Sequence, residues 1–328
     1  MHMADALVAP AVAATMYVCS TSVAGVSVHN VRKEEDSKKI PVMGVMGAFV
    51  FATQMINFTI PGTGSSGHLC GGMLLSAILG PSAGFLTMIG VLLIQCLLFA
   101  DGGLLALGCN IWNMAFYGCF VGAGLIWRLM MKKGASRGKI IGASVLGCVL
   151  TLQLGAFSVV LETLISGITE LPFSAFVLAM QPIHLAIGAV EGLITAAVLI
   201  FIYEARPELL WGIGESSDKE SKFSVRTTVI ILAVASVIIG GVVSLFASAN
   251  PDGLEWSMEQ VAGTAELEAA GGAFDVAASI QETTALLPDY EHTSFSGILG
   301  LALVFVLCFV VSHCFKFFKK QPVREANE

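Results

Sequence analysis

The chain has 328 residues, of which 55% are hydrophobic and only 12% are charged, and its mean hydropathy is +0.82. A soluble domain carries roughly twice that share of charged residues, so this composition excludes a soluble globular enzyme and a disordered chain. It indicates a polytopic membrane protein. The net charge of −7 is informative mainly through its distribution along the chain.

Nine apolar runs divide the chain, and each is a candidate membrane helix because a helix needs about 20 apolar residues to cross a bilayer. They cover residues 6–28, 42–58, 69–80, 82–100, 104–127, 140–161, 180–203, 227–248 and 297–315. The third run is too short for a full crossing, so we expect a tilted or protein-buried helix there. The sequence therefore predicts an all-α fold with about nine transmembrane helices.

The basic residues predict how these helices are oriented. All 17 of them lie in the gaps after the first, fifth and seventh runs or in the C-terminal tail. They are Arg32, Lys33, Lys38, Lys39, Arg128, Lys132, Lys133, Arg137, Lys139, Arg206, Lys219, Lys222, Arg226, Lys316, Lys319, Lys320 and Arg324. Lys and Arg mark cytoplasmic loops, and nine crossings with the N-terminus outside and the C-terminus in the cytoplasm place all of them there. We expect a multi-pass protein of the cell (plasma) membrane, surrounded by the lipid bilayer.

The same pattern predicts two modules. Residues 1–211 hold seven runs, residues 212–226 form a polar cytoplasmic linker, and residues 227–328 hold two helices joined by an outer loop, 249–296. This loop has nine carboxylates and no Lys or Arg. It is either a solvated acidic linker or a segment that steers divalent cations toward a site or covers the site.

The N-terminus has the chemistry of a metal chelate. It lacks the basic region of a removable signal peptide, and initiator methionine is normally removed only before a small residue, so we expect Met1 to be retained before His2. The Met1 amine, the backbone nitrogen of His2 and the His2 imidazole Nδ1 can then bind one ion in two fused rings. A deprotonated amide nitrogen suits ions that accept square-planar coordination, namely Ni(II), Cu(II) and in some cases Co(II).

His68 is a candidate for the fourth nitrogen. It lies in the Gly-rich segment PGTGSSGHLCGG, residues 61–72, which the predicted topology places on the same outer face as Met1. Glycines permit an irregular backbone that can fold over the N-terminus. Residue chemistry alone leaves two alternatives open, a solvated histidine and an ordinary Gly-rich loop.

Several other polar residues are candidates for supporting such a site. Asn57, Ser65 and Ser66 flank the His68 segment, and Asp5 follows the N-terminus; residues of these types orient metal ligands through hydrogen bonds. His184 and Glu191 share one face of the seventh predicted helix. His184 is expected about one turn below the outer surface, where it either supports the site or is satisfied within the bundle.

Three segments carry a resemblance to a known family: MHMADALVAP (1–10), GAFVFATQMINFTIPGTGSSGHLCGG (47–72) and FADGGLLALGCNIWNM (99–114). They resemble the substrate-binding membrane subunit of nickel/cobalt energy-coupling-factor (ECF) transporters. The segment NPDGLEWSM (250–258) resembles the small accessory subunit of the same systems, so the whole chain resembles the fused form. The resemblance implies that Met1, His2 and His68 bind the ion. Many relatives have a glycine in the turn after the chelate, and positions 3–6 here have none.

The resemblance also implies the role and the partners. It implies the substrate-specific component of an ATP-driven importer of Ni(II), or of Co(II) for cobalamin synthesis, with no permanent cofactor. No GxxxxGK[ST] motif is present, so ATP hydrolysis is expected in partner subunits, together with a transmembrane coupling protein. No nucleic acid partner is expected.

Two other classes of function remain open at this point. A self-sufficient channel or secondary transporter requires several charges within the membrane, for which the sequence offers only His184 and Glu191. A membrane-embedded metalloenzyme requires HExxH or a comparable cluster, and the sequence contains neither.

Overall fold

The computed structural model describes residues 1–34, 39–213 and 222–319, which are mostly helical. Lys38, Lys219, Lys320 and Arg324, and most of the predicted linker 212–226, lie outside these residues. The helices are α1 (Pro10–Lys33), α2 (Lys39–Gln54), α3 (Gly72–Leu79), α4 (Pro81–Phe99), α5 (Leu107–Asn110), the π-helix η2 (Ile111–Trp127), α6 (Arg128–Met131), α7 (Arg137–Ser166), α8 (Phe173–Ala205), α9 (Val225–Gly241), α10 (Gly253–Ala262), α11 (Ala273–Thr284) and α12 (Thr293–Lys319). Short 3₁₀ turns cover Asp5–Leu7, Pro207–Leu209, Val243–Phe246 and Pro288–Tyr290. The two strands are β1 (Phe58–Ile60) and β2 (Ser65–Gly67).

Six of the described helices are long and apolar enough to cross a membrane: α1, α4, the continuous helix 107–131, α7, α8 and α12. Leucines on their outer faces are exposed, for example Leu178 at 74% and Leu185 at 51%, as expected of a surface that lipid covers. The protein is a multi-pass membrane protein. Helices α2 and α9 are apolar but shorter, so the number nine and the orientation of the termini stay predictions.

The third apolar run forms a short helix inside the protein, as the sequence predicted. Helix α3 has eight residues and all of them are buried. Its N-terminal neighbour Gly71 has φ +80°, and a Cβ there would lie 2.4 Å from Cγ1 of Val50. A left-handed residue pressed against a side chain must be glycine, which explains why the chain can turn sharply between His68 and α3.

The run 42–58 is not one helix, contrary to the sequence-based prediction. Helix α2 ends at Gln54, and Phe58–Ile60 form β1, which pairs antiparallel with β2 so that Phe58 lies opposite Gly67. Ile56, Phe58 and Ile60 alternate with polar residues, which is the period of a strand rather than of a helix. The β1–β2 hairpin is the exception to the all-α fold, and it carries His68 at its end.

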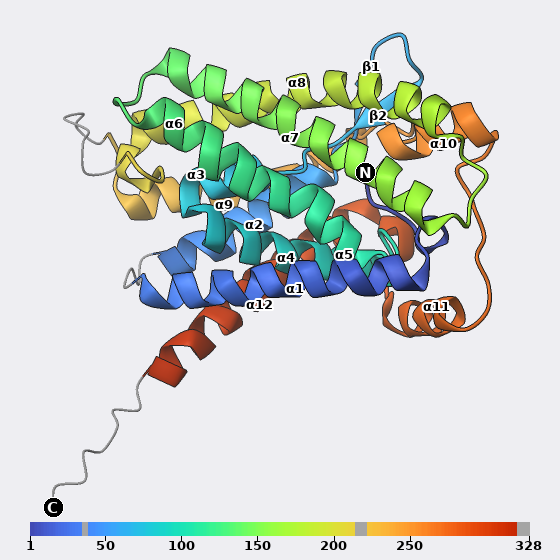
Figure 1. Cartoon of the computed structure of the whole chain (residues 1–328). Helices are drawn as coiled ribbons and strands as arrows, with labels where there is room; N and C mark the ends of the chain where they lie inside the picture. Colours follow the sequence, from blue (N-terminus) through green and yellow to red (C-terminus); the bar gives the residue numbers. More distant parts are fainter. Residues whose placement is uncertain (35–38, 214–221, 320–328) are drawn as a thin grey trace, which may run out of the picture.

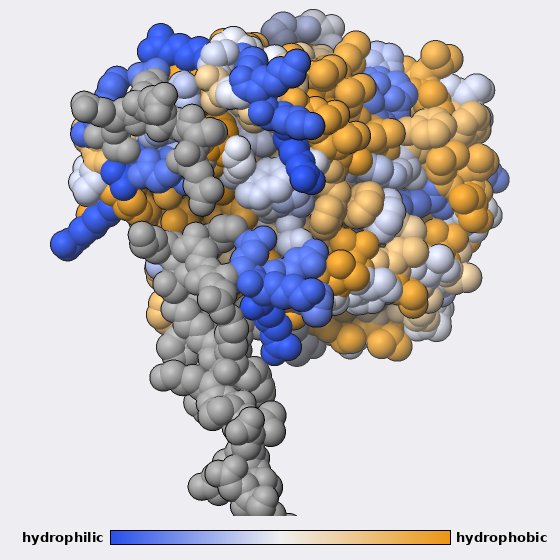
Figure 2. Space-filling view, turned by 60° about the vertical axis from the view of Figure 1, so that its left-hand side comes forward, coloured by the Kyte–Doolittle hydropathy of each residue, from blue (hydrophilic) through white to orange (hydrophobic). Residues whose placement is uncertain are grey.

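The helices form one bundle with two different ends. Helix α7 packs on α8 and on η2, and α12 packs on α2. One end of the bundle holds the N-terminus, the hairpin, α10 and α11 (Figure 1). The other end holds α6 and the C-terminal ends of α1 and α8. Figure 2 turns this second end toward the viewer and shows hydrophilic residues gathered there beside a hydrophobic flank. In the described part of the fold, the segments that carry Lys and Arg therefore lie at the end of the bundle opposite the acidic segment 249–296.

The segment 249–296 is not only a linker. It contains α10 and α11, which pack on α8 and α4 respectively. Leu254 and Met258 of α10 are 1% and 3% exposed. A second buried cluster, which includes Phe51, Phe99 and Leu301, joins α2 and α4 to α12. The C-terminal module is thus packed against the N-terminal one at several places, and α10 is held close to the hairpin.

Candidate metal site

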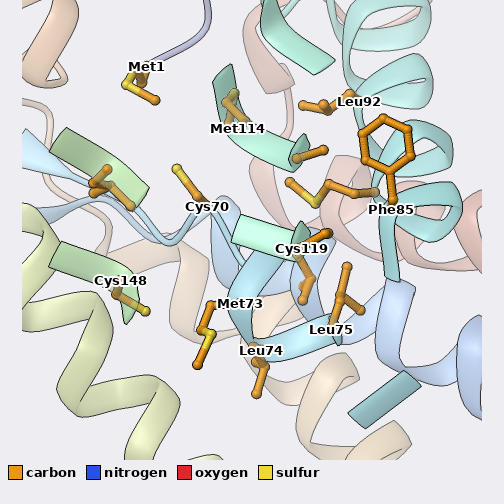
Figure 3. Packing of buried hydrophobic residues seen from close by; sticks show 14 of the residues in the cluster. Met1, Cys70, Met73, Leu74, Leu75, Phe85, Leu92, Met114, Cys119 and Cys148 are labelled. Atoms are coloured by element: carbon orange, nitrogen blue, oxygen red, sulfur yellow. The ribbon is translucent and has the colours of Figure 1, made fainter. Parts of the chain in front are cut away.

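The first three residues fold back into the bundle. Met1 is 4% exposed, and its side chain enters the main buried cluster near Cys70 (Figure 3). The Met3 nitrogen donates to Oδ1 of Asn110 at 2.7 Å, and Nδ2 of Asn110 donates to the Met3 carbonyl at 3.1 Å. The Gly103 nitrogen donates to the same carbonyl at 2.8 Å. These bonds fix residue 3, so the amine and residue 2 are presented from a rigid support.

His68 directly follows β2, and its ring faces the N-terminus. Its Nε2 lies 3.1 Å from the Met1 nitrogen. Its Nδ1 lies 3.0 Å from the carbonyl oxygen of Leu69, and only a protonated Nδ1 can donate there, so Nε2 keeps its lone pair. Burial, followed by the charge of the Met1 amine, lowers the pKa of His68. The ring is therefore in the neutral form that binds metal ions.

The ring of His2 lies next to that of His68, with 5.4 Å between the ring centroids. Its Nδ1 lies 2.9 Å from Oδ1 of Asp101, and the hydroxyl of Tyr290 donates to Oδ2 of the same carboxylate at 2.5 Å. Burial would raise the pKa of Asp101, but His2 and then Tyr290 outweigh it and lower it to about 2. Asp101 is thus an ionised partner that holds the His2 ring in one position.

Asp252 is the second carboxylate at the site, and it comes from the C-terminal module. Its Oδ2 forms an ion pair with the Met1 amine and lies 3.8 Å from Nε2 of His68. Burial would raise the pKa of Asp252, but the amine and His68 hold it well below its usual value. Burial likewise would lower the pKa of the amine, but Asp252 outweighs this and raises it above 8.0. The two groups therefore stabilise each other's charged forms.

Ser65 and Ser66 are fully buried, but their side chains donate to backbone carbonyls rather than to His68. The Ser66 nitrogen donates to the carbonyl of Pro251 at 2.8 Å, and its Oγ donates to that of Asn250 at 2.8 Å. Ser65 Oγ donates to the carbonyl of Ser66 at 3.1 Å. These serines join the hairpin to the turn before α10.

Two other predicted supporting residues act on the backbone around the site. Asp5 Oδ1 accepts from the Ala106 nitrogen at 2.9 Å, which orders the segment after Asp101. Asn57 accepts from the Ser248 nitrogen at 2.7 Å through its carbonyl, and it lines the same cavity as His2. Neither contact orients a histidine directly, so their role as supporting residues stays a prediction.

His184 and Glu191 lie beneath the site on α8. His184 is 1% exposed, its Nδ1 donates to the Met180 carbonyl at 2.8 Å, and its Nε2 has no hydrogen-bond partner in the described part of the chain. It lines a cavity of about 10 Å³ together with Met1, His68 and Asp252. Glu191 Oε1 accepts from the Gly71 nitrogen at 3.0 Å, so it supports the turn that follows His68.

A larger cavity of about 980 Å³ lies over the site, between the N-terminal module and the segment 249–296. His2, His68, Asp101 and Asp252 are part of its lining. Among the described residues, the other charged ones that line it are acidic, namely Asp5, Glu255, Glu268 and Asp289. A negative chamber of this kind concentrates cations near the N-terminus.

Side chains alone do not form a metal centre here. Within residues 1–34, 39–213 and 222–319, no three His, Cys, Asp or Glu side chains are placed to hold an ion together. The group that does converge consists of one amine nitrogen and two imidazoles, with the His2 backbone nitrogen between them in the chain. The arrangement therefore suits an ion that binds main-chain nitrogen.

Sequence reasoning missed three residues of this arrangement: Asp101, Asn110 and Asp252. Asp252 was counted only among the carboxylates of the outer loop. Its spacing from Glu255 was an available signal, because Asp followed three residues later by Glu is typical of a capped helix start, and the structure contains this capping box. That signal predicts the start of α10 but not its position beside Met1.

Comparison with known proteins places the two modules in named families. Residues 2–209 match the family described as the cobalt uptake substrate-specific transmembrane region, CbiM, and residues 226–317 match the PDGLE domain. A relative from Archaeoglobus fulgidus, provisionally named fused nickel transport protein NikMN, is 33% identical over 95% of this chain and 98% of its own. The cobalt transport protein CbiM of Sorangium cellulosum is 29% identical over 64% of this chain and 94% of its own. A crystal structure of a truncated transition metal transporter is 33% identical, with a TM-score of 0.55, and covers 62% of this chain and 99% of that one.

Proposed function

The chain belongs to the cobalt uptake substrate-specific transmembrane family and carries a PDGLE domain behind that region, and from this premise we propose that it captures Ni(II), or alternatively Co(II). The ligands are the Met1 amine, the backbone and Nδ1 nitrogens of His2, and Nε2 of His68. Its relatives are metal transport proteins rather than enzymes. The ion is the transported substrate, bound at the outer face.

The observation that carries this proposal is the 3.1 Å distance between the Met1 nitrogen and Nε2 of His68. In the chelate, the order of donors around the square is amine, His2 backbone nitrogen, His2 Nδ1 and His68. His68 is therefore a neighbour of the amine. Two neighbouring nitrogens, each about 2.0 Å from one ion at a right angle, lie about 2.8 Å apart. The observed spacing is close to this value.

Capture requires one rotation and a free lone pair on each donor nitrogen. The His2 ring turns its Nδ1 from Asp101 to the ion and gives up the proton on that nitrogen, while the amine and the His2 amide each release a proton. A set of four nitrogens that includes a deprotonated amide favours Ni(II), and Co(II) is the second substrate that the ligand types accept.

For transport, we propose that the chain is the substrate-specific component of an ATP-driven ECF-type importer. The sequence contains no P-loop motif, so the energy comes from ATPase subunits that act through a transmembrane coupling protein. A self-sufficient channel is less favoured, because a path for ions requires several charges within the membrane, and Glu191 supports the turn that follows His68 through its contact with the Gly71 nitrogen.

The chelate is tested by nickel titration of the purified full-length protein with a C-terminal tag. Addition of two glycines before Met1 should abolish high-affinity binding, since the extended chain has no amine at this buried point. His68→Ala should weaken binding by at least 100-fold, the order of loss expected for a metal ligand.

His184→Ala is the matched control, because it removes a buried imidazole that lines the same small cavity and is not a proposed ligand. It should change the affinity by less than about tenfold. Undiminished affinity in the extended protein would refute the N-terminal chelate. Equal losses in the two histidine variants would place the site elsewhere.

A further inference from the structure

We propose that Asp252 is a positioning residue through which the C-terminal module completes the metal site. Its carboxylate holds the Met1 amine against His68, in the orientation from which the amine binds the ion. This inference rests on the proposed N-terminal chelate and adds the contact between the amine and the Asp252 carboxylate.

The two oxygens of Asp252 have separate tasks. Oδ1 accepts from the backbone nitrogens of Leu254 at 2.7 Å and Glu255 at 3.0 Å, as the N-cap of α10. Oδ2 is thereby left to the Met1 amine. Because the cap fixes the carboxylate plane, Oδ2 cannot turn away from the amine without breaking the helix start.

The contact is compatible with the loaded site. A primary amine that donates its lone pair to a metal keeps two hydrogens, and one of them can still be donated to Oδ2. Carboxylates that accept hydrogen bonds from metal-binding groups orient those groups and strengthen their binding. Asp252 therefore acts through Met1 rather than on the ion itself.

The turn that carries Asp252 is held against the metal-binding segment on both sides. Ser66 bonds to the carbonyls of Asn250 and Pro251, and Nε1 of Trp256 donates to the Thr63 carbonyl at 3.0 Å. A Cβ at Gly253 would lie only 2.9 Å from Cε1 of His184. This glycine lets the turn lie directly on α8, so the hairpin, the turn and the N-terminus form one packed unit.

The Met1 amine depends on the Asp252 carboxylate for its counter-charge. It is buried, and a buried ammonium without a counter-charge is costly. Asp101 faces His2 rather than the amine, and the charged residues that line the cavity above are acidic in the described part of the chain. If Asp252 is neutralised, the amine gains most by moving toward the cavity and away from Nε2 of His68.

The test compares Asp252→Asn with the wild type and with Glu255→Gln in the full-length protein. Asparagine is as good an N-cap as aspartate, so α10 keeps its start while the amine loses its carboxylate. Glutamine keeps the capping box at residue 255 and removes one charge from the same cavity, which makes it the matched control. Nickel affinity is measured by competition with a chelator, and the absorption band of bound nickel is recorded for each protein.

We expect Asp252→Asn to bind nickel about 10- to 100-fold more weakly, with the absorption band unchanged because the four nitrogens are still the ligands. Glu255→Gln should stay within about twofold of the wild type. If Asp252→Asn does not fold, Asp252→Ser also caps the helix without a charge and should show the same loss.

Three results would overturn this inference: unchanged affinity in Asp252→Asn, an equal loss in Glu255→Gln, or a shifted band, which would make Asp252 a ligand. The extended N-terminus and His68→Ala are measured beside these variants. If those two lose nickel and Asp252→Asn does not, only the role of Asp252 fails. If those two keep nickel, the proposed chelate fails first.

Discussion

Two carboxylates hold the proposed donor nitrogens of the metal-free site, Asp252 at the Met1 amine and Asp101 at Nδ1 of His2. His68 differs, because its Nε2 meets the amine while its Nδ1 is occupied by a backbone carbonyl. In the proposed capture, Nε2 of His68 therefore has a free lone pair for the ion, whereas the amine is protonated and the His2 ring faces Asp101. The amine and His2 must change their state during capture.

The Met1–Asp252 pair predicts a pH dependence for the metal-free protein. A group with a raised folded-state pKa stabilises the fold below its unfolded pKa, and the stabilisation is lost as the pH rises through the folded value. For the Met1 amine this loss lies above pH 8.0. The pKa of Asp252 is lowered, so its contribution is present above 3.8 and is lost only well below that pH. The pair thus stabilises the fold from roughly pH 4 to pH 8.

We expect the thermal midpoint of the metal-free protein to fall as the pH rises above 8.0, by the few degrees that a loss of about 1 kcal/mol in the free energy of unfolding corresponds to. The measurement is thermal unfolding across this range, with chelator present. Asp252→Asn should lack this fall, because its amine has no ion pair to lose. A fall of the same size in both proteins would assign it to other groups.

At the scale of residues, the sequence could predict a metal-binding role where the position in the chain alone supplies the donor atoms. Met1 and His2 carry the donor nitrogens of a chelate wherever the N-terminus lies, and the Gly-rich segment drew attention to His68. The structure does bring Met1 and His68 together, and their binding of a metal stays a prediction. Asp101 and Asp252 were not predictable as partners, because these contacts join residues 99 and 251 positions apart and depend on the packing of whole helices.

At the scale of elements, the turn between β2 and α3 sets where His68 lies. Gly71→Ala should destabilise the protein by about 1–3 kcal/mol, since alanine is strained at φ +80° and its Cβ would overlap Val50. Nickel affinity should fall as well, because the turn that follows His68 must shift.

Gly134→Ala is the control for backbone strain alone. Gly134 has φ +86° and nothing within 4 Å of the added Cβ, and it lies in the loop after α6. It should cost about 1–2 kcal/mol and leave nickel affinity unchanged, as measured by unfolding and by titration. Equal effects of the two variants on affinity would show that the turn does not position His68.

The elements themselves were predictable in proportion to their length. Most runs of 18 or more apolar residues became long helices, namely α1, α4, 107–131, α7, α8 and α12, since little else can bury their backbone in a membrane. The run 227–248 gave only the shorter helix α9. The strand β1 was missed, because it begins at the last residue of the apolar run 42–58 and hydropathy alone does not detect a period of two. Helices α10 and α11 were missed because their apolar faces are narrow and the carboxylates of the segment mask them.

At the scale of the whole molecule, basic and acidic surface residues lie at opposite ends of the bundle. Helix α6, which the exposed Lys132 and Lys133 follow in the chain, lies at one end of the bundle, and helices α10 and α11, with the exposed Glu259 and Glu282, lie toward the other (Figure 1). Because basic loops stay in the cytoplasm, this division predicts that the site opens to the outside. An importer needs its capture site on that side.

Two proteases test this orientation without any mutation. Trypsin cuts after Lys and Arg, all of which are predicted to be cytoplasmic, so trypsin added to the outside of intact cells should leave the chain whole. A glutamate-specific protease added to the same side should cut within 249–296, where Glu259 and Glu282 are exposed, because exposed polar loops are the preferred sites of cleavage. In inverted vesicles trypsin should cut the loop 128–139, and the segment 249–296 should be protected. Tryptic cleavage of that loop from outside would reverse the topology and place Met1, His68 and Asp252 on the cytoplasmic face, where a capture site for import has no access to its ion.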